Sequence, residues 1–392
     1  MTVASATPLT IQESTLVLGL DARKAFDFGI GSYVRGLLGG LSQLDFGFRV
    51  VVFGPAGVAP PRDPRFEWVE DTSPGYSLRE LWSLSRQARK HRLDLFHALH
   101  YVVPFGLRCR RVVTIHDLNH LRRPEFLPHA VGTVYADRMI RRALCVEQVI
   151  AVSAATAADL RLAFGVRGDR IEVVPNGIDE RFFDPPPRST GAPAEAPLLF
   201  VGNPKPHKNL EGVLRAMARQ RQWSRLVVAG SPPSPALRQL AADLGVADRI
   251  DWRGFVPADE LPDLYRQCLA LVLVSKAEGF GLPVAEAMAC GRPVVISRLP
   301  ALLEVAGDAA LVVVDDDLPA LAAALDRLAG DSALRERLGE NAVRAAQRFH
   351  WRFAAQRTLD VYRRVLFGSA LPSDPPEPGG FPREVFSLRG SR

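Results

Sequence analysis

The chain has 392 residues, of which 47% are hydrophobic and 23% charged, and its formal net charge is +6. This is the composition of an ordinary folded protein long enough for two domains, and no segment approaches the roughly 20 uninterrupted apolar residues of a membrane-spanning helix. The four cysteines have neither the density of a disulfide scaffold nor the spacing of a zinc site, and residues 1–10 lack the basic and apolar regions of a signal peptide, so we expect a cytoplasmic protein.

In the first half of the chain, short apolar runs alternate with segments of helical period, which is typical of βα units around a parallel sheet. The turn after the first run contains Gly29 and Gly31 and opens a helix. It is not a dinucleotide-binding fingerprint, because Val34 stands where the third glycine of that motif belongs. The two glycines would still allow a ligand to approach the backbone closely. The expected strands of this half are 16–20, 49–53, 95–99, 112–115, 148–152 and 171–174.

The region 79–142 carries an excess of positive charge. It contains thirteen Lys or Arg and five Asp or Glu, a balance of 13 − 5 = +8. Such a surface could attract an anionic membrane or a lipid phosphate. The alternative is a solvated face in a sequence that uses arginine far more than lysine. We do not expect nucleic acid as a partner, because no recognisable nucleic-acid-binding module is present.

A polar pair, His116 and Asp117, follows the expected strand 112–115. Ligands of parallel sheets lie beyond the carboxyl ends of the strands, so both side chains should face a cleft. His116 could donate to a sugar hydroxyl or stabilise developing charge, with Asp117 orienting it. A single histidine is equally often structural.

A proline-rich segment divides the chain into two similar halves. Residues 185–197 cannot hold a regular element and are predicted to form a linker. A second series of strands is expected at 198–201, 226–229, 250–252, 270–274, 294–296 and 310–314. We therefore predict two parallel-sheet domains with a ligand site in the cleft between them. The predicted organisation is a first domain over 1–184, the linker, a second domain over 198–350, a helix over 351–367 that packs back across the structure, and a flexible tail over 368–392.

The second domain opens with a strand, a turn that contains Gly202 and Asn203, and then His207 and Lys208 at the start of a helix. Lys208 could place its ammonium group against a diphosphate that backbone N–H groups already hold. An isolated lysine at a helix start is more often simply solvated. Lysine is rare in this sequence, however, and an acidic loop lies in the same domain, so we favour the diphosphate.

The most informative segment is the run Glu278-Gly-Phe-Gly-Leu-Pro-Val-Ala-Glu286, here called the acid motif. A strand-like segment enters it, and a helical segment that begins at Pro283 leaves it. Gly279 and Gly281 would leave the N–H groups of the helix start open to an anion such as phosphate. Two carboxylates beside a phosphate would suit the hydroxyls of a nucleotide-sugar. The pattern alone fits a plain strand–turn–helix equally well.

Three aspartates, 315–317, follow the last expected strand. The Leu-Pro and the helical pattern after them favour a helix cap over a metal site. We therefore expect no bound metal.

Together these segments resemble the family 4 retaining glycosyltransferases, which have the GT-B fold, over residues 16–366. The strongest marker is a pair of acids separated by seven residues, met here by Glu278 and Glu286. The supporting segments are Gly-Ile-Gly-Ser-Tyr (29–33), Val-Thr-Ile-His-Asp-Leu (113–118), Val-Val-Pro-Asn-Gly-Ile-Asp (173–179) and Val-Gly-Asn-Pro-Lys-Pro-His-Lys-Asn-Leu (201–210). The resemblance implies an α/β architecture of two Rossmann-like domains that face each other across a cleft.

The resemblance also implies roles for individual positions. Glu286 would bind the ribose hydroxyls and Glu278 the transferred sugar, while Lys208 would contact the diphosphate. His116 would lie beside the donor sugar, and Gly29 would approach the phosphates from the opposite domain. The catalytic residues would be His116, Lys208 and Glu278. The remaining substrate-binding positions would be Gly31, Asp117, Asn203, His207, the main chain of Phe255 and Val256 beside the base, and the backbone of Phe280, Gly281 and Leu282.

One departure from the family pattern concerns charge. Many members have Arg-Lys where this chain has His207-Lys208, so the second cation depends on protonation of His207.

The implied activity is a metal-independent, retaining hexosyl transfer in polysaccharide biosynthesis. The motifs favour GDP-mannose as donor over UDP-sugars, and a glycan or polyprenyl-diphosphate-linked glycan as acceptor, with the enzyme peripheral on the inner face of the membrane. Two alternatives remain: a nucleotide-sugar epimerase on the same scaffold, and a nucleotide-sugar-binding subunit without turnover.

Overall fold

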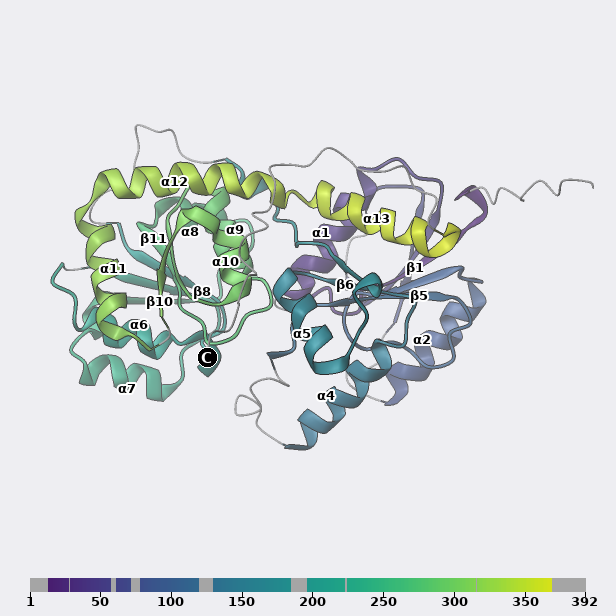
Figure 1. The fold of residues 1–392 in the computed structure, drawn as a ribbon, viewed down its shortest axis with the longest axis horizontal. Coiled ribbons are helices and arrows are strands. Elements are labelled where there is room, and N and C mark those ends of the chain that lie inside the picture. The colour runs from purple at the N-terminus through teal and green to yellow at the C-terminus, as the bar shows by residue number, and fades with distance from the viewer. Residues whose placement is uncertain are drawn as a thin grey trace, which may run out of the picture.

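The computed structural model describes residues 13–27, 29–57, 61–71, 78–119, 130–184, 196–222, 224–314 and 316–368. These residues form two α/β domains that lie side by side (Figure 1). The predicted architecture of two parallel-sheet domains is therefore confirmed. Most of the predicted linker, and all of the predicted tail after residue 368, lie outside the described residues.

The N-terminal sheet has seven parallel strands in the order β3-β2-β1-β4-β5-β6-β7. Its central strands are apolar on both faces because helices cover both; Val50 to Phe53, for example, are fully buried. The strands are β1 (Val17–Asp21), β2 (Arg49–Gly54), β3 (Phe66–Glu70), β4 (Leu95–Ala98), β5 (Arg110–Ile115), β6 (Gln148–Ala151) and β7 (Ile171–Val173). The helices of this domain are α1 (Ile30–Ser42), α2 (Leu78–Lys90), α4 (Ala130–Ala143) and α5 (Ala154–Phe164).

Strand β3 is the one strand of this sheet that was not predicted. It lies at the edge and reads Phe-Glu-Trp-Val-Glu, with Glu67 and Glu70 exposed. Its acidic residues interrupt the apolar ones, so it lacks the continuous apolar run that marks strands buried on both faces.

The C-terminal sheet has six parallel strands in the order β10-β9-β8-β11-β12-β13. Each lies within two residues of its predicted position. They are β8 (Leu198–Val201), β9 (Leu226–Ala229), β10 (Ile250–Gly254), β11 (Ala270–Leu273), β12 (Val294–Ser297) and β13 (Ala310–Val313). The helices are α6 (Leu210–Met217), α7 (Pro235–Asp243), α8 (Leu261–Gln267), α9 (Leu282–Ala289), α10 (Pro300–Ala306), α11 (Leu318–Gly330) and α12 (Ser332–Ala346).

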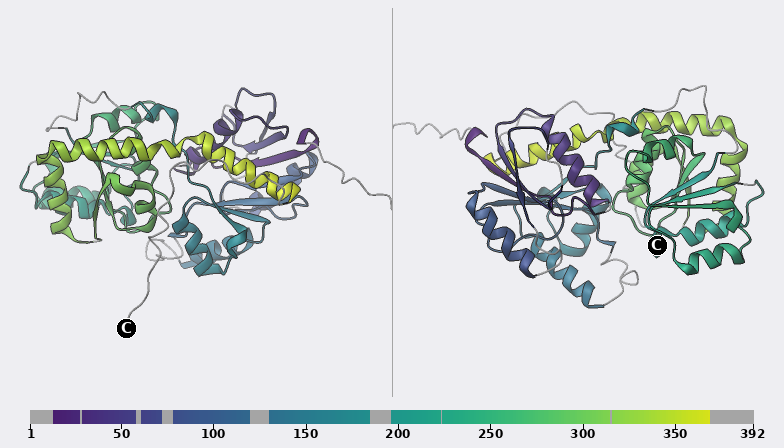
Figure 2. Two further views of the ribbon diagram at one scale, coloured as in Figure 1. Left: turned by 45° about the horizontal axis from the view of Figure 1, so that its top comes forward. Right: turned by 180° about the vertical axis from the view of Figure 1, so that it is seen from behind.

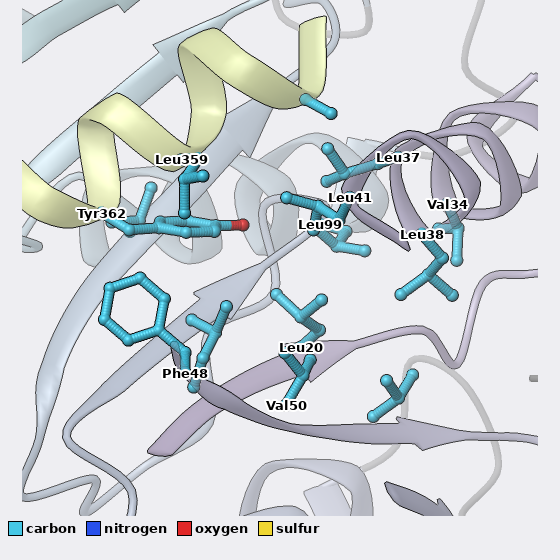
Figure 3. Close-up of a cluster of buried hydrophobic side chains, with 14 of the residues drawn as sticks. Leu20, Val34, Leu37, Leu38, Leu41, Phe48, Val50, Leu99, Leu359 and Tyr362 are labelled. Carbon is cyan, nitrogen blue, oxygen red and sulfur yellow. The ribbon is translucent and has the colours of Figure 1, made fainter. Parts of the chain in front are cut away.

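The last described helix, α13 (Trp351–Phe367), crosses from the C-terminal domain and packs on the N-terminal domain, as Figures 1 and 2 show in yellow. Its Leu359 and Tyr362 join the buried cluster that contains Leu37 and Leu41 of α1 (Figure 3). Trp351 lies against three glycines: a Cβ at Gly36 or Gly177 would overlap its ring, and one at Gly40 would lie 2.7 Å from its carbonyl oxygen. Glycine therefore lets α1 and the segment around 177 approach Trp351 closely.

Within the described part of the chain, no helix combines the length and the apolar character needed to cross a membrane.

Candidate active site

The carboxyl ends of β8 and β11 meet in the middle of the C-terminal sheet, where the strand order reverses. Such a reversal opens a crevice beyond the strand ends, where ligands of α/β sheets bind. Lys208 ends the 3-10 turn η5 (Pro206–Lys208) that follows β8, and Glu278 follows β11. The topology therefore brings together two residues that are 70 positions apart.

Lys208 and Glu278 form an ion pair. Lys208 Nζ donates to Glu278 Oε1 at 2.6 Å, and Ser275 Oγ donates to the same oxygen at 2.7 Å. The two charged side chains are only 18% and 9% exposed. Because both hydrogen bonds use Oε1, Oε2 keeps acceptor capacity for a hydroxyl of a ligand. The sequence did not indicate Ser275, although it stands just beyond the carboxyl end of a strand, as His116 does.

Helix α9 begins directly after the glycines of the acid motif. Gly281 has φ +99°, in the left-handed region, and a Cβ there would lie 2.5 Å from Leu302 Cδ2. The position therefore favours glycine for its conformation as well as for its lack of a side chain. Pro283 stands in the first turn of α9, as predicted. Leu282 begins the helix. Pro283 has no N–H and the N–H of Val284 donates to the Gly281 carbonyl at 2.9 Å, so at this end it is the N–H of Leu282 that has no intrahelical acceptor and can bind an anion.

Gly279 also has a structural role that was not expected. A Cβ on it would overlap the carbonyl oxygen of His116, at the end of β5 in the other domain. The absence of a side chain therefore lets the two domains meet at this point, rather than only exposing N–H groups to a ligand. The next residue, Phe280, is buried and packs edge-on against Phe349 with ring centroids 5.6 Å apart.

Glu286 lies four positions into α9, beside the phenol of Tyr265. Tyr265 Oη donates to Glu286 Oε2 at 2.7 Å. Burial raises the pKa of Glu286 to about 7; the Tyr265 hydrogen bond opposes this shift, and the negative charge of Asp179 adds to it. The carboxyl group therefore changes charge near neutral pH. Tyr265 was not predicted, because nothing in its local sequence distinguishes it from a core tyrosine.

On the N-terminal side, His116 follows β5. Its Nε2 lies 2.8 Å from the carbonyl oxygen of Leu99, which can only accept, so this nitrogen carries the proton and Nδ1 has the lone pair. Burial lowers the pKa of His116 and outweighs the opposing effects of this hydrogen bond and of Asp117, so the ring is neutral. The Leu99 carbonyl therefore orients the ring. Asp117 Oδ1 accepts from the N–H of Asn119 at 3.0 Å.

A chain of buried hydrogen bonds lies behind His116. Tyr33, whose ring packs edge-on against His116 at 4.8 Å between centroids, has its hydroxyl 2.9 Å from Thr114 Oγ1. Thr114 Oγ1 is 2.9 Å from His97 Nε2, and His97 Nδ1 is 2.6 Å from the Tyr362 hydroxyl on α13. These hydrogen bonds connect the side chains next to His116 with α13. No sequence pattern indicated this network.

The two N-terminal glycines differ in their surroundings. Gly29 caps α1 with φ +71°, and a Cβ on it would meet nothing within 4 Å. A Cβ on Gly31, in contrast, would lie 2.5 Å from the carbonyl oxygen of Ala25. Gly29 therefore leaves open space at a helix start. Gly31, in contrast, lets the helix pack closely against the preceding turn at Ala25.

The remaining predicted residues of the C-terminal domain lie at the ends of β8 and β10. Asn203 accepts, through its carbonyl oxygen, from the N–H of Lys205 at 2.7 Å. Burial and the adjacent charge of Lys208 lower the pKa of His207, so His207 supplies no second cation at neutral pH. Phe255 and Val256 follow β10, and the Phe255 side chain is 71% exposed.

One of the aspartates after β13, Asp317, caps a helix, as predicted. Asp317 accepts from the N–H of Ala320 at 2.9 Å at the start of α11, and Asp316 pairs with Lys276 at 3.0 Å. Asp315 lies outside the described residues. Among the residues that the structure describes, no three His, Cys, Asp or Glu side chains gather closely enough to hold a metal ion.

Comparison with known proteins agrees with this geometry. Residues 29–182 match the family described as Glycosyltransferase Family 4, and residues 188–345 match Glycosyl transferases group 1. The chain is 37% identical over 224 residues to a D-inositol 3-phosphate glycosyltransferase of Acidothermus cellulolyticus, covering 52% of this chain and about half, 50%, of that relative. It is 29% identical over 305 residues to O-antigen chain mannosyltransferase B of Escherichia coli, covering 73% of this chain and 77% of the relative.

The fold is also found among solved structures. Sucrose-phosphate synthase from Thermosynechococcus elongatus superposes with a TM-score of 0.75 at 22% identity, covering 89% of this chain and 99% of that one. The two family matches follow one another along the chain and coincide with the two domains. The protein therefore belongs to the family 4 glycosyltransferases.

Proposed function

We propose that the protein transfers a hexose from a nucleotide-diphosphate donor to a glycan acceptor with retention of anomeric configuration. The observation that carries the proposal is the Lys208–Glu278 pair, 2.6 Å apart, at the strand-order reversal next to the start of α9. An ammonium group and the N–H of Leu282 at the helix start suit a diphosphate, and a carboxylate with a free oxygen suits a sugar hydroxyl.

In the proposed reaction, the bond between the sugar and the diphosphate breaks first, and the sugar becomes oxocarbenium-like. Negative charge then gathers on the diphosphate, where Lys208 and the start of α9 stabilise it. The acceptor hydroxyl attacks from the face that the diphosphate leaves, and its proton passes to the departing diphosphate oxygen. His116, neutral and with a lone pair on Nδ1, faces the sugar from the other domain. We propose that no metal is required, because these groups supply the positive charge that the leaving group needs.

Each domain has a distinct part in this proposal. Glu286 accepts the ribose hydroxyls, and the main chain at Phe255 and Val256 contacts the base. The backbone of Phe280, Gly281 and Leu282, together with Asn203 and His207, borders the diphosphate and the sugar. From the opposite domain, Gly29 brings the start of α1 to the phosphates. Closure of the domains would exclude water and suppress hydrolysis of the donor.

GDP-mannose is the favoured donor, with UDP-sugars as the alternative. The motifs around Gly29 and His116 support mannose, and so does the mannosyltransferase activity in the name of the Escherichia coli relative. We propose a glycan, free or linked to polyprenyl diphosphate, as the acceptor.

A lipid-linked acceptor would require the enzyme to approach a membrane. Helices α2 and α4 present Arg86, Arg89, Lys90, Arg138 and Arg141 on the N-terminal domain, and all five are exposed. Trp82, 60% exposed, stacks on Phe105 at 5.5 Å between centroids, and Arg142 covers the same ring at 3.6 Å. Exposed tryptophan among cations is suited to an anionic bilayer surface. Flotation with phosphatidylglycerol vesicles tests this, and failure to bind at low salt would contradict it.

The experiment that tests the activity has two stages. A thermal-shift screen with GDP, UDP, ADP and their sugar conjugates identifies the donor, because a ligand that binds only the native state raises Tm. Reaction of that donor with a glycan acceptor, in the presence and absence of a chelator, is then followed by NMR of the anomeric proton. A product with the anomeric configuration of the donor, formed in chelator, supports the proposal. An inverted product, or an epimerised donor without transfer, would overturn it.

A further inference from the structure

The acid motif is held by the opposite domain. Ser153 Oγ donates to the carbonyl oxygen of Gly279 at 2.7 Å, and Thr156 Oγ1 lies 3.2 Å from the same oxygen. Both hydroxyls are buried and belong to the start of α5 in the N-terminal domain. The Gly279 backbone also lies so close to the carbonyl oxygen of His116 that a side chain at position 279 would overlap it. The residue directly after Glu278 is therefore held in place by the N-terminal domain.

A second contact joins the domains at the same helix. Glu304 of α10 accepts from the N–H of Ala154 at 2.9 Å and from the N–H of Ala155 at 3.4 Å. Ser153, the N-cap of α5, accepts from Thr156 N at 3.0 Å. The N–H groups at the start of α5 are thus capped partly by Ser153 of the same domain and partly by Glu304 of the other one. A carboxylate is favourable there because a helix start carries partial positive charge. Separation of the domains would leave two N–H groups of α5 without this acceptor.

These contacts adjoin the proposed donor site. The Gly279 carbonyl is one residue from Glu278, whose carboxylate binds Lys208 and Ser275. A shift of the backbone at 279 would therefore move the carboxylate relative to the ammonium group. Small displacements of this kind have large effects on rate when reacting groups must be aligned.

We propose that Ser153, Thr156 and Glu304 form a latch between the two domains, and that the latch holds Glu278 where it meets the transferred sugar. The three are positioning residues, since they act through the backbone of the acid motif and through α5. The positioning role rests on the proposed function, whereas the latch itself does not. Donor binding and domain closure are then coupled: a sugar that contacts Glu278 is bound best when the Gly279 carbonyl has both hydroxyl donors.

The latch is tested without any assay of activity. Small-angle X-ray scattering of the full chain, without nucleotide, should give a larger radius of gyration for Ser153→Ala/Thr156→Val and for Glu304→Ala than for the wild type. The matched control is Ser234→Ala, which removes an N-cap of the same kind from α7, where Ser234 accepts from Leu237 N at 3.3 Å. It should leave the radius unchanged. Equal radii for the wild type and both latch variants would overturn the latch.

The positioning role is tested by comparing turnover with nucleotide binding, using GDP-mannose and GDP, or UDP-glucose and UDP if the screen selects them. Thr156→Val should lower kcat by about tenfold or more, because the acid is displaced. Its Kd for the nucleoside diphosphate should stay within about threefold, because that ligand lacks the sugar that meets Glu278. Thr156→Ser, which keeps the hydroxyl, should restore kcat to within about twofold of wild type.

An unchanged kcat in folded Thr156→Val, or equal losses in kcat and in diphosphate affinity, would overturn the positioning role. If the wild type bound none of GDP, UDP and ADP, the proposed function would fail, and the scattering result would still decide the latch.

Discussion

Glu286 is the single residue whose protonation should control donor binding. Its pKa of about 7 means that it is a carboxylate above neutrality and a carboxylic acid below. Only the carboxylate can accept from both ribose hydroxyls without donating a proton itself. Calorimetry should therefore show donor affinity falling by about tenfold per pH unit below pH ~7. Glu286→Gln should bind more weakly at high pH and lose this dependence. A variant that kept the wild-type pH profile would assign the titration to another group.

Lys208 is the residue on which departure of the diphosphate should depend. Lys208→Ala removes the charge that the leaving group needs, so kcat should fall by about 10²–10³-fold. Glu278 keeps its bond to Ser275, so we expect little change in Tm. Lys205→Ala is the matched control, since Lys205 is exposed three positions earlier in the same turn and should retain kcat within about threefold. Wild-type turnover in Lys208→Ala would refute the role.

Local patterns identified some residues of the site and missed others. Lys208 and Glu278 could be predicted because each stands at the end of a strand inside a recognisable motif. Ser275 and Tyr265 could not, because a hydroxyl that supports an acid has no signature of its own. The structural reason for a glycine at position 279 could not be predicted either. It depends on the His116 carbonyl, in another domain and more than a hundred residues away, and such contacts arise only from tertiary placement.

At the scale of elements, the buried strands were the most predictable part of the fold. Strands covered on both faces are continuous apolar runs, so β8 and β9 were predicted at their observed bounds. Edge strand β3 was missed for the opposite reason. The crossing of α13 was predicted, but the packing of Trp351 against three glycines was not. Gly36 and Gly40 look like ordinary breaks in the helical pattern of α1.

Two glycines of helix α1 allow a test of the packing of Trp351 against Gly36. Gly36→Ala places a methyl group inside the ring of Trp351 and should destabilise the protein by about 1–3 kcal/mol, since neither helix can move away without disrupting the core. Gly39→Ala, one turn further along, meets nothing within 4 Å and should stabilise the protein by about 0.5–1 kcal/mol through helix propensity. Urea denaturation measures both. Equal effects would mean that α13 is not held at Trp351.

For the molecule as a whole, acid stability should depend on the buried polar network that ties α13 to the N-terminal sheet. His97 links Thr114 of β5 to Tyr362 of α13, and burial lowers its pKa to about 3; nearby His100, also buried, has a pKa of about 3 for the same reason. Both rings are neutral in the folded protein. Above pH ~6.5 the unfolded chain is neutral at these positions too, and the histidines contribute no pH dependence.

Below that pH, the unfolded chain binds a proton at each histidine and the folded protein does not. Stability should therefore fall as the pH drops from about 6.5 towards 3, by up to about 1.4 kcal/mol per pH unit for each ring. His97→Gln should be less stable at pH ~7, because it disrupts the hydrogen bonds to Thr114 and Tyr362, but its stability should fall less steeply with acid by one proton. Tyr362→Phe removes a hydrogen bond and keeps the ring, so it should lower stability and leave the slope unchanged. Urea denaturation at several pH values measures both quantities, and a wild-type slope in His97→Gln would mean that His97 is not the group that takes up the proton on unfolding.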